Sequence, residues 1–222
     1  MELETAKYEA ACEAREQQAV EQNLALDELI TGLSYGVIEA VEDYISIVLA
    51  NSVYPEGFPV THTASFQPSS AELQLKVVIP GPEHMPTTRA YRYVKAKDEI
   101  TATPMSQKEA RERYASIVHS VALRSLHEIF EADRRGLIRA ISLELGTETL
   151  SPATGRETYV PFVSVATERE PFELIDLSAV VPAATLEHLG AVVSKNPYEL
   201  NPASGWPPSL WRLRPAWRRI ED

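Results

Sequence analysis

The spacing of apolar residues predicts helices at both the start and the middle of this chain. Residues 2–31 are rich in Ala, Glu, Gln and Leu and contain neither Pro nor Gly, which favours a helix. A second helix is predicted over residues 36–50, where apolar side chains recur at three- and four-residue steps. The first helix carries a narrow and weak apolar seam, in part alanine, formed by Ala6, Ala10, Val20, Leu24 and Leu33. That seam is suited either to docking on the rest of the protein or to pairing with another chain.

Alternating apolar positions predict strands in the next part of the chain. A strand is predicted over residues 60–66, and residues 73–79 alternate in this way. Because Pro68-Ser69-Ser70 separates the two segments, we expect a hairpin. A third strand is predicted over residues 89–96.

The clearest helix is predicted from Ser106 to about Arg135. Ser106 and Glu109 have the spacing of a capping box, and Gly136 is a natural stop. Strands over residues 137–145 and 158–166 then form a second hairpin, and a short helix over residues 182–193 ends the regular part.

These elements predict an α+β fold, because hairpins indicate antiparallel pairing. We expect an acidic helical arm over residues 1–33 and an α+β domain over residues 34–202. In that domain the antiparallel hairpins form one sheet, and the long helix packs on it. The tail over residues 203–222, rich in Pro, Trp and Arg, is expected to be irregular.

The charge is concentrated in the arm. The whole chain has a net charge of −11, but residues 1–50 carry eleven acidic side chains against two basic ones. An acidic chain is a poor candidate for coating nucleic acid by bulk electrostatics. Because the remainder is nearly neutral, local contact with DNA stays open.

Other features narrow the class of protein. Cys12 is the single cysteine, which excludes an internal disulfide and a zinc site built from several thiolates. The sequence shows neither a secretory signal nor an apolar run of the roughly 20 residues that span a bilayer. We therefore expect a cytoplasmic protein without a membrane partner.

A series of short sequence motifs over residues 23–202 resembles the sequence of a known protein family. The motifs are Asn23-Leu24-Ala25-Leu26-Asp27-Glu28-Leu29, Tyr44-Ile45-Ser46-Ile47-Val48-Leu49, Tyr54-Pro55-Glu56-Gly57-Phe58-Pro59, Tyr91-Arg92-Tyr93-Val94-Lys95, Asp98-Glu99-Ile100-Thr101, Leu123–Asp133, Pro152-Ala153-Thr154-Gly155 and Pro197-Tyr198-Glu199-Leu200. In order and spacing they resemble a region of large bacterial restriction-system proteins that carry an Mrr-type endonuclease domain elsewhere in the chain. The resemblance implies a role in defence against foreign DNA such as phage DNA, by association with a nuclease rather than by cutting.

The chain departs from that pattern in three places. Leu145-Gly146 stands where the family usually has Asn-Gly, and Thr185-Leu186 stands where it has Cys-Leu. After Pro202 the family continues into further folded sequence, whereas this chain continues into the Trp- and Arg-rich tail.

One short segment of the chain partly matches a known type of nuclease site. Gln74-Leu75-Lys76 has the Gln-x-Lys form of some Mrr-type sites, in which acidic side chains hold a metal beside the lysine. The aspartate expected upstream on a neighbouring strand is missing, because residues 52–71 contain only Glu56. We therefore predict no catalytic residue in this chain.

One pair of residues has the spacing of metal ligands. His127 and Glu131 lie one helical turn apart and form a two-ligand pair at most, for which a surface hydrogen bond is the plainer interpretation. We predict neither a metal nor a cofactor.

The segment from Arg89 to Lys97 is the best candidate for contact with nucleic acid. In an extended strand, alternate residues share a face, which would place three cations beside two aromatic rings. Cations meet phosphates and rings stack on bases. The alternative is a solvated edge strand protected by its lysines. The candidate residues are Arg89, Tyr91, Arg92, Tyr93, Lys95 and Lys97.

Three functions remain open at this stage. The first is a non-catalytic accessory or interaction domain of a restriction-type defence protein, with a nuclease domain or subunit and DNA as its partners. The second is a degenerate metal-dependent endonuclease domain. The third is a stand-alone interaction module that self-associates through its N-terminal helices.

Overall fold

The computed structural model describes residues 2–204, with the side chains of residues 2–4 and 6 outside that description. The described chain divides at Tyr44 into two compact units, whereas the sequence pattern suggested a boundary at residue 33. Helix α1 (Glu2–Tyr35) makes up most of the first unit. Gly36, with a φ of 65°, separates it from α2 (Ile38–Ala50). Glycine adopts this left-handed conformation without steric cost, which explains why the helix breaks here.

The second unit is built on a five-stranded sheet with the strand order β1-β2-β5-β6-β7. Its strands are β1 (Thr61–Gln67), β2 (Glu72–Val78), β5 (Ala140–Leu150), β6 (Glu157–Glu168) and β7 (Val192–Val193). The pairs β1–β2 and β5–β6 are antiparallel, so both predicted hairpins are confirmed, as is the α+β class.

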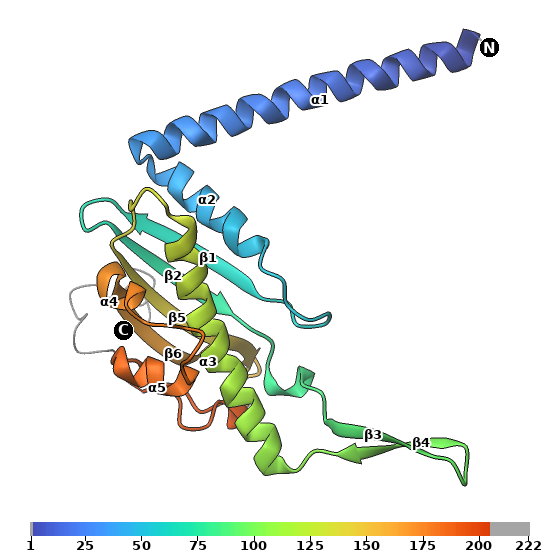
Figure 1. Ribbon diagram of the computed structural model, residues 1–222, viewed down its shortest axis with the longest axis vertical. Coiled ribbons are helices and arrows are strands. Elements are labelled where there is room, and N and C mark those ends of the chain that lie inside the picture. Colours follow the sequence, from blue (N-terminus) through green and yellow to red (C-terminus); the bar gives the residue numbers. More distant parts are fainter. Residues whose placement is uncertain (1, 205–222) are drawn as a thin grey trace. The chain divides into compact units, whose positions relative to one another are not determined.

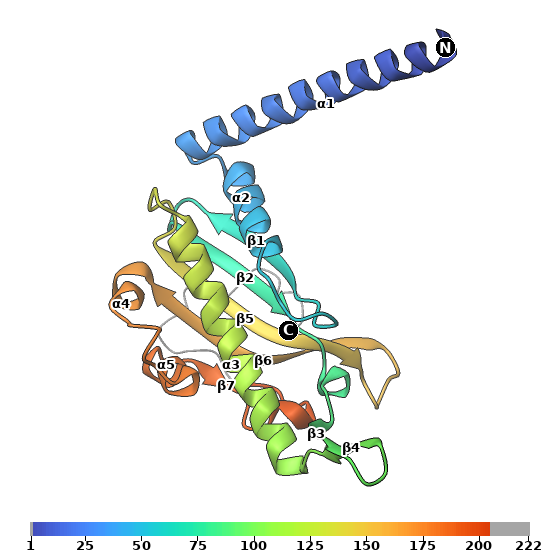
Figure 2. The same cartoon turned by 45° about the vertical axis from the view of Figure 1, so that its right-hand side comes forward.

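The two predicted hairpins form one sheet, as expected, but the strands show two features that the sequence pattern did not reveal. First, the two hairpins join through a parallel pair, β2 and β5, with Leu75 opposite Leu143. Parallel neighbours cannot be joined by a tight turn. The connection instead runs through α3 (Gln107–Ala132), which crosses one face of the sheet (Figures 1 and 2).

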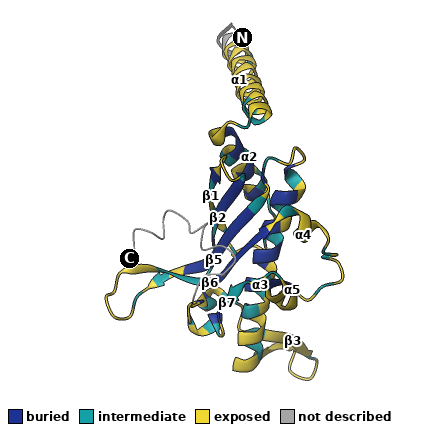
Figure 3. Ribbon diagram, turned by 90° about the vertical axis from the view of Figure 1, so that its left-hand side faces the viewer, coloured by how far each residue is buried: buried dark blue, intermediate teal, exposed yellow. Residues whose placement is uncertain are grey.

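Second, β3 (Thr88–Val94) and β4 (Glu99–Pro104) form a separate two-stranded sheet. The predicted third strand therefore ends two residues early and pairs with a strand that the sequence pattern did not reveal. Figure 3 shows the contrast in burial: strands β2 and β5 of the central sheet are mostly buried, whereas β3 is mostly exposed.

The core lies between α3 and the central sheet. Both ends of α3 are set by side chains. At its start, the Ser106 hydroxyl accepts the Glu109 N–H at 3.3 Å and Glu109 accepts the Ser106 N–H at 3.0 Å, which confirms the capping box. At its end, the Asp133 carboxylate accepts the N–H of Ile138 at 2.7 Å, and the helix stops at Ala132 rather than Arg135. The buried face of the helix includes Tyr114, Val118, Ala122, Leu126 and Ile129.

The remaining elements are short. They are α4 (Arg169–Glu173), α5 (Pro182–His188) and the 3-10 turns Pro82–His84 and Pro197–Glu199. The predicted last helix is therefore shorter than expected, and its final residues form strand β7. Most of the predicted irregular tail, residues 205–222, lies outside the described residues. Over residues 2–204, no helix is long and apolar enough to cross a membrane.

Candidate functional site

The β3–β4 hairpin carries the residues predicted to contact nucleic acid. Tyr91 lies opposite Ala102 and Tyr93 lies opposite Ile100, so the two tyrosines share one face of the ribbon. Arg92 lies opposite Thr101 and therefore belongs to the other face. The tyrosine face is open to solvent, with exposed fractions of 73% for Tyr91, 58% for Tyr93 and 71% for Ile100.

The predicted face of three cations and two tyrosines does not form. Strand β3 ends at Val94, so Lys95 and Lys97 lie in the turn that follows. The strand register shifts between Thr88 and Ala90, and the guanidinium of the intervening Arg89 lies 3.3 Å from Glu109. Of the predicted face, only Tyr91 and Tyr93 remain together, while Arg89 lies at the base of the hairpin and Lys95 and Lys97 lie at its tip.

Local contacts order the hairpin. The Tyr93 hydroxyl donates to Asp98 at 2.5 Å, which raises the pKa of Tyr93, and the Thr101 hydroxyl donates to the Arg92 carbonyl at 3.0 Å. Asp98 has a φ of 52°, a left-handed conformation that aspartate tolerates in turns. Within residues 2–204, the side chains of Arg92, Lys95 and Lys97 form neither an ion pair nor a hydrogen bond.

The partial nuclease motif lies on β2, where Gln74 and Lys76 share a face. The parallel register places Ser142 beside Gln74 and Glu144 beside Lys76. The structure thus supplies an acidic residue on a neighbouring strand, downstream of Lys76 in the sequence rather than upstream. It was missed because the β2–β5 pairing joins residues about 70 positions apart.

This row of polar side chains is buried. Glu72 and Glu144 are each 1% exposed, and the Ser142 hydroxyl donates to Glu72. Burial raises the pKa of Glu72, and the hydrogen bond from Ser142 partly opposes that rise. The Lys76 ammonium lies 4.0 Å from the centre of the Tyr159 ring. Among the described residues, no three His, Cys, Asp or Glu side chains are placed to hold a metal ion.

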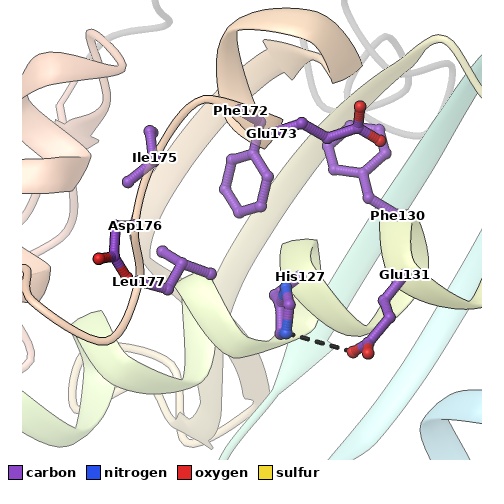
Figure 4. A pocket seen from close by; sticks show the side chains of 8 residues that line it. All are labelled: His127, Phe130, Glu131, Phe172, Glu173, Ile175, Asp176 and Leu177. Atoms are coloured by element: carbon purple, nitrogen blue, oxygen red, sulfur yellow. Dashed lines mark ion pairs between the residues drawn. The ribbon is translucent and has the colours of Figure 1, made fainter.

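The third candidate, His127 with Glu131, lies beside a pocket of about 330 Å³ (Figure 4). His127 Nε2 is 3.2 Å from Glu131, and both side chains are largely exposed, as expected for a surface pair. Phe130 and Phe172 are buried beneath, with ring centres 5.3 Å apart. The opposite wall is the segment from Glu173 to Leu177, which had no sequence signal linking it to α3.

Comparisons with known proteins return no relatives. No family model, no curated protein and no solved structure matches this chain.

Proposed function

We propose that this chain is a non-catalytic interaction domain of a restriction-type system that acts against foreign DNA, and that α1 is its docking element. The assignment to a restriction-type system rests on the resemblance of the short sequence motifs over residues 23–202. The docking role rests on one observation: α1 is long, regular and exposed along nearly its whole length.

A partner would stabilise a helix of this kind. With 34 residues it is about 50 Å long. Most helical stability in proteins comes from packing an apolar face rather than from intrinsic propensity. Yet the large apolar side chains of α1 stay exposed, at 58% for Val20, 57% for Leu24, 54% for Leu26 and 48% for Ile30.

The charge of α1 indicates what kind of partner it binds. The helix carries eight acidic residues against two basic ones, Lys7 and Arg15. Pairing with a second copy would bring like charges together, which is unfavourable along helix interfaces. We therefore propose a basic surface on the nuclease-bearing component of the system as the partner.

The test uses the purified nuclease-bearing component and the full chain in a binding titration. Replacing Leu24 and Ile30 together with Glu removes two buried contacts of the complex, so we expect affinity to fall by at least about tenfold. The matched control replaces Gln17 and Gln22 with Glu, which adds the same charge on the same helix at polar positions, and should bind like the wild type.

Three results would contradict the proposal. These are absence of binding by the wild type, equal losses in both double variants, or self-association of the wild type that the Leu24 and Ile30 replacements abolish. The last result, seen by light scattering, would instead support the stand-alone, self-associating module.

A degenerate metal-dependent endonuclease is the second candidate, because Glu144 lies beside Lys76 in the sheet. We rank it lower since Glu72 and Glu144 are almost completely buried, where a phosphate cannot reach them. A plasmid-cleavage assay with magnesium decides between the two. Cutting that is lost in Lys76→Ala would establish the nuclease, and cutting that persists in Lys76→Ala would assign it to another source.

A further inference from the structure

We propose that the β3–β4 hairpin binds single-stranded nucleic acid, stacking a base on Tyr91 and Tyr93 and contacting phosphates with the cations near its tip. This inference is independent of α1 and adds a second binding surface to the proposed interaction domain. It rests on the exposure of the hairpin, on its charge and on the spacing of its aromatic rings.

The first argument is that the hairpin exposes an apolar face that its own fold does not cover. Every residue of β4 and most residues of β3 are exposed (Figure 3). An isolated two-stranded ribbon is only marginally stable in water. Covering Tyr91, Tyr93 and Ile100 would therefore stabilise it.

The second argument is the charge of the covering molecule. The hairpin carries four cations and two acidic residues, although the chain as a whole has a net charge of −11. Arg89 is neutralised by Glu109, and Asp98 accepts a hydrogen bond from Tyr93. The remaining cations, Arg92, Lys95 and Lys97, are without ion-pair partners among residues 2–204. Against Asp98 and Glu99, these three cations leave a local excess of one positive charge on the hairpin, which favours an anionic ligand.

The third argument concerns the kind of anion. Tyr91 and Tyr93 are two residues apart on one strand, which separates them by about 7 Å along the ribbon and leaves room for one flat base between them. Every base has an aromatic face, so such rings stack on single strands with little sequence preference. An acidic protein surface could pair with the cations of the hairpin, but it would leave the two tyrosine rings without a role in binding. A duplex keeps its bases stacked on one another and offers the rings no free base face.

The rings are also partly fixed before binding. The hydrogen bond from Tyr93 to Asp98 holds one ring in place. A side chain that is ordered beforehand loses less conformational entropy when its ligand arrives.

The test is a fluorescence-anisotropy titration of a short labelled oligo-dT with the full chain at low and physiological salt. Tyr91→Ala and Tyr93→Ala should each weaken binding by roughly tenfold, because each removes one stacking contact. Lys95→Glu should weaken binding mainly at low salt and reduce its dependence on salt.

Two matched controls separate local from general effects. Tyr35→Ala removes an exposed tyrosine outside the hairpin, and Arg135→Glu makes the same change of charge as Lys95→Glu at an exposed position beyond the end of α3. Both should bind like the wild type. Circular dichroism establishes that each variant is folded.

Four outcomes would overturn the proposal. Two concern oligo-dT itself: the wild type does not bind it at low salt, or the variants and the controls lose affinity equally. The other two are that duplex DNA binds as tightly as oligo-dT with an affinity unchanged in the tyrosine variants, or that polyglutamate displaces the oligonucleotide at equal charge concentration. The double variant Leu24→Glu, Ile30→Glu should keep its affinity for oligo-dT, so failure of the α1 proposal and failure of this one are distinguishable.

Discussion

Arg169 makes ion pairs, hydrogen bonds and a ring contact within the second unit. Its guanidinium lies 2.5 Å from Asp133 and 3.1 Å from Glu173, and it donates to the carbonyl oxygens of Phe130 and Ile138 at 2.9 and 3.0 Å. It also lies over the Phe130 ring, 4.9 Å from its centre. One side chain thereby ties the end of α3 to the start of α4 and to the chain entering β5.

Replacing Arg169 with Ala should lower the free energy of unfolding by about 3 kcal/mol, because the Asp133 carboxylate would stay buried without its counter-charge. Asp133 is 7% exposed. The control is Arg111→Ala, since Arg111 pairs with Glu199 at the surface, where such pairs contribute less than about 1 kcal/mol. Urea denaturation measures both, and equal losses would contradict the assignment.

The β5–β6 pair depends on a close approach at Gly146. The strand register shifts between Leu145 and Gly146, which marks a bulge. A Cβ at Gly146 would lie 2.7 Å from the Tyr159 ring and 2.9 Å from the Pro161 Cα, and it would clash with the Val160 carbonyl oxygen. Backbone atoms of the neighbouring strand cannot move away without breaking the pairing.

Gly146→Ala should therefore destabilise the protein by about 3 kcal/mol, as overpacking in a rigid site does. Gly81→Ala is the matched control, because there the atoms nearest to the added Cβ belong to the flexible carboxylate of Glu83. We expect the Gly81 variant to lose less than about 1 kcal/mol. A thermal-melting comparison that ranked the two variants in the opposite order would refute this account of the bulge.

At the scale of the whole molecule, the two sheets of the second unit differ in how well their backbone hydrogen bonds are shielded from solvent. The central sheet and α3 together hold most of the buried apolar core, whereas the β3–β4 hairpin is exposed on both strands. Local opening is easiest where few apolar contacts cover the backbone hydrogen bonds. The hairpin should thus open without unfolding the central sheet.

Hydrogen exchange followed by mass spectrometry checks this expectation. Peptides from residues 88–104 should exchange at least about tenfold faster than peptides from β5. The peptides from β6 serve as an internal control, since they should match β5. Uniform protection across both sheets would show that the hairpin is more tightly held than its exposure indicates.

The sequence by itself determined the elements whose signals are local. The capping pair Ser106 and Glu109, the turn residues after β1 and the alternating strands predicted the start of α3 and both hairpins, because neighbours along the chain make those contacts. The exposed tyrosines were also named from the sequence, although the end of β3 at Val94 separated them from the lysines.

Only the tertiary structure decided which distant segments meet. The parallel pairing of β2 with β5, the neighbours Lys76 and Glu144, and the pocket between α3 and residues 172–177 each join residues far apart in the chain. Such contacts depend on which apolar faces cover one another across the core. That choice is made by packing the whole unit, and no short stretch of sequence records it.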